Sequence, residues 1–153
     1  ELAGALVPVE VGGRTMEDQV KVLIADDDPD ARIALQRAFA NGENGFQAHN
    51  SPCGTTAMLQ FGLFRPDVIV LGVQNGDSNC WDTLRRVREL STVPVIALSS
   101  NDETELRIRS LKLGADYCVN KPVGFPELCA RARALIRRDQ RPDGAMQPQQ
   151  LPA

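Results

Sequence analysis

The sequence is poor in the residues that hold transition metals. Among 153 residues there is one histidine, His49, and the four cysteines, Cys53, Cys80, Cys118 and Cys129, form no C-x-x-C pair. A zinc site is therefore not expected. No apolar run approaches the roughly 18–20 residues that cross a bilayer, and the first fifteen residues lack the basic start and apolar core of a signal peptide. These absences predict a cytoplasmic protein with reduced thiols and no membrane contact.

An excess of positive charge is also missing. The formal net charge is −3 and the pI is near 5.2, so a broad nucleic-acid-binding surface on this chain is not expected. The content of 42% hydrophobic and 24% charged residues is ordinary for a folded domain. We place that domain at residues 16–139. Residues 1–15 are expected to be an upstream or added tail, and residues 140–153, rich in proline and glutamine, a flexible linker or tail.

Short apolar runs alternate with helical patterns along the domain. Runs such as V-K-V-L-I-A and D-V-I-V-L are typical of strands buried on both faces. We expect strands at residues 20–25, 46–50, 67–71, 94–98 and 116–119, and helices from residue 29 and at 54–64, 81–90, 102–113 and 125–138. Asp28 is the expected N-cap of the first helix, and Gly114 is expected to close the fourth. Regular alternation predicts an α/β protein, a (βα)5 doubly wound sandwich with one parallel sheet.

The residues at the carboxyl ends of these strands are the ones that carry chemistry, because ligands of such sheets bind there. Asp26 and Asp27 follow the first strand, Ser99 ends the fourth, and Lys121 follows the fifth. Adjacent carboxylates repel each other and suit a hard cation such as Mg²⁺. A hydroxyl and a lysine nearby can bind phosphoryl oxygens. Taken singly, these residues have a plainer interpretation as a helix cap and a solvated lysine.

Four segments in this order resemble the receiver domain of bacterial two-component response regulators. They are V-L-I-A-D-D-D-P-D-A-R, P-D-V-I-V-L, V-P-V-I-A-L-S-S and L-G-A-D-Y-C-V-N-K-P. The resemblance covers residues 20–138 and is closest to the receivers of winged-helix transcription regulators. It implies a five-stranded parallel sheet in the flavodoxin-like order 2-1-3-4-5, and a role in phosphorelay signal transduction and transcription regulation rather than as an enzyme.

The resemblance also implies roles for the residues at the strand ends. Asp26 and Asp27 match the acidic pair of the family, with Asp27 as the likelier direct metal ligand. Gln74 stands where a backbone carbonyl usually completes the metal site. Ser99 matches the switch hydroxyl, and Lys121 matches the invariant lysine.

The main departure from the family is at Gly72, where the phospho-accepting aspartate would stand. Glycine has no side chain that could attack a phosphodonor. Asp67 begins the strand at its other end, Asp77 lies in the following loop, and Asp82 lies in the next helix. The metal also loses its third carboxylate. The sequence therefore predicts an atypical receiver, or pseudo-receiver, that has no catalytic residue and binds no cofactor except at best weak Mg²⁺.

A second set of residues matches the face through which the similar receivers dimerise, formed by the fourth helix, fifth strand and fifth helix. Arg107 and Glu127 match a charged pair that crosses the symmetric dimer, and Asp116 matches another acidic member. Tyr117 replaces an acid that would face Arg131, so one pair is broken. A weaker or constitutive homodimer is expected, and a solvated helical face is the plainer alternative.

Cys118 stands where an aromatic switch residue is common in the family. With Gly72 and Cys118, both the trigger and the follower of the family's switch are missing. A packed core cysteine is the plainer interpretation of Cys118, and a redox-sensing thiol is the alternative.

Three functions remain open from the sequence. The first is a receiver that acts through protein–protein contacts, independently of phosphorylation. Its partners would be a second copy, a histidine kinase or another signalling protein, with DNA reached only through an effector domain absent from this sequence. The second is a conventional phosphorelay receiver with an engineered or low-activity change at Gly72. The third is a flavin- or nucleotide-binding module, against which the acidic D-D-D-P turn argues by repelling phosphate.

Overall fold

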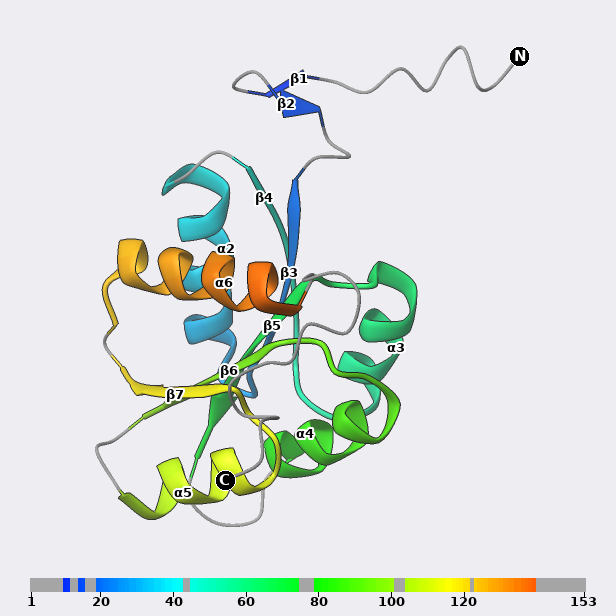
Figure 1. The fold of residues 1–153 in the computed structure, drawn as a ribbon, viewed down its shortest axis with the longest axis vertical. Coiled ribbons are helices and arrows are strands. Elements are labelled where there is room, and N and C mark those ends of the chain that lie inside the picture. Colours follow the sequence, from blue (N-terminus) through cyan, green and yellow to red (C-terminus); the bar gives the residue numbers. More distant parts are fainter. Residues whose placement is uncertain are drawn as a thin grey trace.

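The computed structural model describes residues 10–11, 14–15, 19–42, 45–74, 79–100, 104–121 and 123–139. Its main sheet has five parallel strands in the order β4-β3-β5-β6-β7 (Figure 1). The strands are β3 (Val20–Ala25), β4 (Phe46–Ser51), β5 (Val68–Val73), β6 (Val95–Ser99) and β7 (Tyr117–Asn120). Counted within this sheet, the order is 2-1-3-4-5, so the predicted α/β, flavodoxin-like topology is confirmed.

Helices connect the successive strands of this sheet. They are α2 (Pro29–Gly42), α3 (Thr55–Phe64), α4 (Asn79–Leu90) and α5 (Thr104–Lys112), and α6 (Phe125–Asp139) follows the last strand. The expected ranges hold to within about two residues. The largest shift on the strands is at β5, which continues through Gly72 and Val73. Residues 102 and 103, the expected start of the fourth helix, lie outside the described part of the chain.

The helices cover both faces of the sheet, and successive strand residues alternate between them. Val22 and Ile24 of β3 belong to the core under α2 and α6, together with Phe39 and Leu128. Leu23 and Ala25 belong to the other core, with α3, α4 and α5. Figure 1 shows α2 and α6 on one side of the sheet and α3 and α4 on the other. Burial on both faces explains why the three inner strands, β3, β5 and β6, are nearly continuous apolar runs, whereas the edge strand β4 is more polar. None of the described helices is long and apolar enough to cross a membrane.

Two predicted helix ends are confirmed by their hydrogen bonds and backbone angles. The side chain of Asp28 accepts a hydrogen bond from the backbone N–H of Asp30 at 3.1 Å, which is the N-cap contact of α2. Gly114 follows α5 with a φ of +115°, and its N–H donates to the carbonyl of Leu111. A side chain there would be strained, which is why glycine ends this helix.

A short antiparallel pair, β1 (Glu10–Val11) and β2 (Arg14–Thr15), lies in the segment where we expected only a tail. The two strands are separated in sequence by Gly12 and Gly13, a composition typical of two-residue hairpin turns. Strands this short give no readable alternation, so the sequence pattern missed them. The rest of the expected tails, residues 1–9 and 140–153, lies outside the described residues.

Arg88 of α4 connects its helix to the strands on its face of the sheet. Its guanidinium donates to the carbonyls of Gly114 and Val93, each at 2.7 Å, and to Oδ2 of Asp116 at 2.7 Å. The same Oδ2 accepts from the backbone N–H of Val95, and Oδ1 of Asp116 lies 3.7 Å from Nη2 of Arg138 in α6. One arginine and one carboxylate therefore join α4, the strand ends and α6.

Arg88→Ala should lower the free energy of unfolding by about 2–3 kcal/mol, because it leaves a partly buried carboxylate and two carbonyls without this donor. Arg86→Ala is the matched control. Arg86 is 45% exposed and pairs with Asp82 only at 3.8 Å, so its loss should cost less than about 0.5 kcal/mol. Urea denaturation of both variants measures the difference, and equal costs would contradict this account of Arg88.

Candidate functional site

The parallel register brings the predicted residues to one edge of the sheet. Ala25 pairs with Leu71, Val73 with Ser99, and Ser99 with Asn120. Asp26, Gly72, Ser99 and Lys121 therefore lie at the carboxyl ends of neighbouring strands, as the strand ends in the sequence predicted.

The buried Asp26 and the partly exposed Lys121 form an ion pair at this edge. Nζ of Lys121 lies 3.0 Å from Oδ2 of Asp26. Oδ1 of Asp26 accepts a hydrogen bond from the backbone N–H of Asp28 at 2.9 Å. Asp26 is only 1% exposed, and a carboxylate buried to this extent needs a paired cation and hydrogen bonds. Both of its oxygens are thus engaged within the protein.

The carboxylate of Asp26 lies directly over the backbone of Gly72. A Cβ atom placed on Gly72 would be 2.1 Å from Oδ2 and 2.4 Å from Cγ of Asp26. Real Cβ atoms do not approach other atoms this closely. The side chain of Asp26 therefore occupies the space that any side chain at position 72 would need. Asp26 can lie there because residue 72 is glycine.

Asp27, the predicted direct metal ligand, contacts a different part of the chain from Asp26. Asp27 is exposed, and its Oδ1 accepts a hydrogen bond from the backbone N–H of Cys53 at 3.1 Å. Gln74 follows β5 and is exposed, and the loop after it, residues 75–78, is outside the described residues. Among the residues the structure does describe, no group of three or more Asp, Glu, His or Cys side chains could hold a metal ion. This arrangement does not fit a resident Mg²⁺, and weak binding stays a prediction.

Ser99, the predicted switch residue, has a partner that sequence reasoning missed. Its hydroxyl donates to Oδ1 of Asn120 at 2.8 Å, and its carbonyl accepts from the backbone N–H of Lys121. Ser99 is 1% exposed. The sequence could have shown this contact through strand position, because Ser99 and Asn120 are the last residues of two strands that pair directly.

Two of the other acidic residues considered as phosphate acceptors, Asp67 and Asp82, do not reach this edge. Asp67 precedes β5, and its carboxylate accepts from the backbone N–H of Lys21 at 2.9 Å, at the opposite end of the sheet. Asp82 is on the exposed side of α4, where it pairs with Arg85 and Arg86. Asp77 lies outside the described residues. The register predicted from the sequence, with Gly72 at the carboxyl edge of β5, is confirmed.

All four cysteines are buried, and none of them forms a disulfide. Burial, with the negative charge of Asp27 as a second cause, raises the pKa of the Cys53 thiol far above its usual range, so this residue next to the site stays a neutral thiol. Cys118 is 3% exposed and belongs to the core under α3, α4 and α5, which agrees with the interpretation of a packed core residue.

On the face where dimer contacts were predicted, three residues contact their own chain. Arg107 donates to the carbonyl of Cys118 at 3.1 Å. The guanidinium of Arg131 lies 4.2 Å from the ring centroid of Tyr117, and Asp116 holds Arg88. Glu127 is exposed in the first turn of α6. Tyr117, which replaces an acid opposite Arg131, thus gives that arginine a cation–π contact instead.

The family model described as the response regulator receiver domain matches residues 22–133. The chain belongs to this receiver family. The matched region includes β3 from Val22 onward, the other four strands of the main sheet in full, and every predicted pocket residue.

Named relatives of the receiver are transcription regulators. This chain is 35% identical over 121 residues to the transcriptional activator protein IrlR of Burkholderia pseudomallei, and the match covers 79% of this chain and 52% of that protein. It is 37% identical over 123 residues to the transcriptional regulatory protein CseB of Streptomyces coelicolor, covering 80% and 52%. The chain therefore spans about half the length of these curated relatives.

Solved receiver domains share the fold. The receiver domain of the Francisella response regulator 1452 superposes with a TM-score of 0.69 at 32% identity, covering 80% of this chain and 100% of that one. The BeF3-activated receiver domain of Klebsiella pneumoniae RstA superposes with a TM-score of 0.67 at 25% identity, covering 76% and 98%.

Gly72→Ala should destabilise this receiver by about 1–3 kcal/mol, because the new methyl group forces the Asp26 carboxylate away from Lys121. Gly62→Ala is the matched control, since a Cβ at this helical glycine has no neighbour within 4 Å. It should stabilise the fold by up to about 1 kcal/mol.

A double-mutant cycle with Asp26→Ala identifies the cause. If the Asp26 carboxylate is the group that clashes with the new methyl, Gly72→Ala should lower the free energy of unfolding less in the Asp26→Ala background than in the unchanged chain. Thermal and urea unfolding give the four free energies, and strict additivity would show that another group resists the methyl.

Proposed function

We propose that this receiver acts in transcription regulation through protein–protein contacts and without being phosphorylated. The named relatives support the regulatory setting, since both are transcription regulators. Because the chain spans only about half of their length, contact with DNA is assigned to an effector domain and not to this receiver. A histidine kinase or another signalling protein is the proposed upstream contact.

The observation that carries the proposal is the Asp26 carboxylate over Gly72. Phosphorylation needs a carboxylate whose lone pair can reach a phosphodonor from solvent. Position 72 has no side-chain oxygen. Asp26, whose carboxylate occupies the space beside it, is 1% exposed and both of its oxygens are already hydrogen-bonded. Asp26 is therefore poorly placed to serve as a replacement acceptor.

The contacts around Ser99 support the same proposal. In the family that this chain resembles, the switch hydroxyl moves toward the phosphoryl group. Here the hydroxyl of Ser99 is bound to Asn120 in the buried edge, and Cys118 provides no large ring that could follow it. These features favour a receiver with one fixed state over a conventional phosphorelay receiver with low activity.

The chain should show no phosphoryl adduct by intact mass spectrometry after incubation with acetyl phosphate and Mg²⁺, because no accessible carboxylate occupies position 72. A receiver that carries the aspartate, treated in parallel, confirms that the reagents work. An adduct on the unchanged chain would contradict the proposal.

The Gly72→Asp variant tests the pocket in the same assay. We expect it to remain largely unmodified, because the new side chain competes with Asp26 for one space. Strong phosphorylation of this variant would show that Asp26 moves aside easily and that the rest of the pocket is intact. That result would limit the proposal to the chain with Gly72 and remove the role of Asp26.

We also propose that two copies associate weakly through α5, β7 and α6. The exposed Glu127 is available for a charged contact, while Arg107, Arg131 and Asp116 already have partners in their own chain. A symmetric dimer would have to share or replace those contacts, which lowers its affinity.

Sedimentation over a range of concentrations should therefore show a monomer that dimerises only at high concentration. Glu127→Lys should reduce the dimer fraction, because it places like charges near Arg107 of the second copy. Glu89→Lys, at an exposed residue of α4, makes the same charge change away from this face and should leave the mass unchanged. Equal behaviour of both variants, or no dimer at any concentration, would contradict this proposal.

A further inference from the structure

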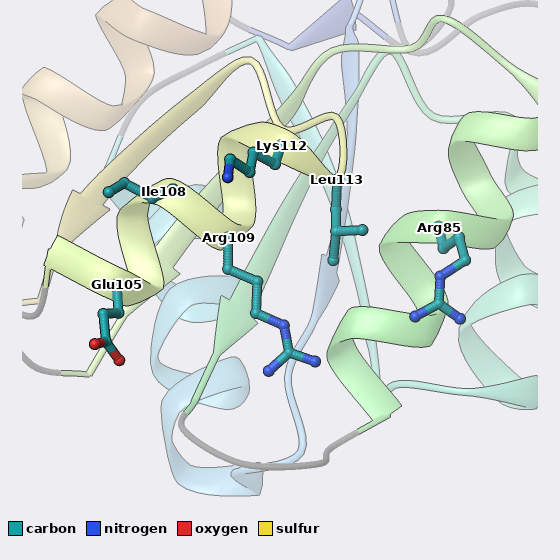
Figure 2. Close-up of a pocket in the computed structure, with 6 residues that line it drawn as sticks. All are labelled: Arg85, Glu105, Ile108, Arg109, Lys112 and Leu113. Carbon is teal, nitrogen blue, oxygen red and sulfur yellow. The ribbon is translucent and has the colours of Figure 1, made fainter.

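A groove lies between α4 and α5, away from Gly72 and Lys121. Its lining consists of three basic, one acidic and two aliphatic side chains, namely Arg85, Arg109, Lys112, Glu105, Ile108 and Leu113. Figure 2 shows Arg109 pointing from α5 into the space between the helices, Arg85 facing it from α4, and Glu105 at the far end of α5.

The charge of these two helices is opposite to that of the whole chain. Helices α4 and α5 carry six arginine or lysine and three acidic residues, a formal charge of +3. The whole chain has a formal charge of −3. Arg88, one of the six, is paired with Asp116, but Arg85, Arg109 and Lys112 line the groove with Glu105 as its one acidic residue, a formal charge of +2. A cationic groove of this kind attracts anionic groups and orients them as they approach.

Arg109 is held in position by an aromatic ring. Its guanidinium lies 4.3 Å from the ring centroid of Trp81, which is 2% exposed in the core. Stacking restricts the long side chain, so less freedom is lost when the guanidinium contacts a ligand. Arg85 pairs with Asp82 at 3.4 Å, and both side chains are more than half exposed. Such a surface pair is worth little and exchanges readily for another carboxylate.

The groove also has an apolar component. Ile108, which is 46% exposed, and the partly buried Leu113 both line it. Figure 2 shows them toward opposite ends of α5. A small inorganic anion would make no use of these aliphatic groups. Glu105 repels a continuous polyanion at one end of the groove, whereas a chain with spaced acidic groups can avoid it.

We propose that this groove docks an acidic, partly apolar segment of a partner protein, with carboxylates on Arg85, Arg109 and Lys112 and aliphatic side chains on Ile108 and Leu113. The proposal rests on the proposed function in one respect, that the receiver acts through protein contacts. It does not depend on the state of position 72, so the phosphorylation assay and a docking assay can fail separately.

The test is a titration of the full chain into a fluorescein-labelled peptide with glutamate and leucine at helical spacing, followed by fluorescence anisotropy at low and high salt. We expect saturable binding that weakens with salt. The same peptide with glutamine in place of glutamate should bind at least about tenfold more weakly, because the charged contacts are removed.

Matched variants locate the contact. Arg85→Glu combined with Lys112→Glu should weaken binding at least about tenfold through like-charge repulsion, and Ile108→Ser should weaken it severalfold. Two control variants change charge on α6, away from the groove. Arg137→Glu is a single charge reversal at an exposed residue, and Arg137→Glu combined with Arg133→Glu matches the double reversal in the groove. Both controls should leave binding of the peptide nearly unchanged. Chemical shift changes in a ¹H–¹⁵N spectrum should concentrate in α4 and α5.

Three results would overturn the proposal. The first is no binding of the glutamate peptide, and the second is equal weakening by the α6 control variants. The third concerns a single-stranded DNA oligonucleotide with the same charge as the glutamate peptide. If it binds more tightly than the peptide, and the Arg85→Glu, Lys112→Glu variant loses that binding, the groove would be assigned to nucleic acid.

Discussion

The ion pair between Asp26 and Lys121 is the contact on which the pocket depends. The two residues are 95 positions apart in the sequence, and their strands, β3 and β7, are separated by β5 and β6 in the sheet. Their side chains meet across the end of β5, where glycine leaves the space open. A buried carboxylate without this lysine would be costly in folding free energy. Asp26 reaches the lysine by lying close to the backbone of residue 72, so the ion pair requires glycine at that position.

Much of the fold was readable from the sequence, because its signals are local. Apolar runs predicted the buried strands, Asp28 and Gly114 predicted two helix ends, and alternation predicted the parallel sheet. The same pattern placed Asp26 and Lys121 at one edge. The pairing between them was not readable, since it depends on a side chain that is absent from a third strand. Likewise, long arginines have several partners within reach, and only the packed structure shows which they contact.

The two regions of interest have opposite physical characters. At the edge, Asp26 is bonded to Lys121 and Ser99 to Asn120, and Asp26 and Ser99 are each 1% exposed. Polar groups that are already paired in this way give rigidity more readily than binding. The groove between α4 and α5 is open, cationic and partly apolar, with one guanidinium held by Trp81. In a receiver that uses protein contacts, recognition is therefore better supported on the helices than at the strand ends.

The carboxylate of Asp116 has one further consequence. One oxygen holds Arg88 of α4 and the other lies near Arg138, in the last turn of α6. These helices cover opposite faces of the sheet, yet a single side chain at its edge spans both. The helix layers on the two faces are therefore linked at this edge by charge as well as through the packed strands between them.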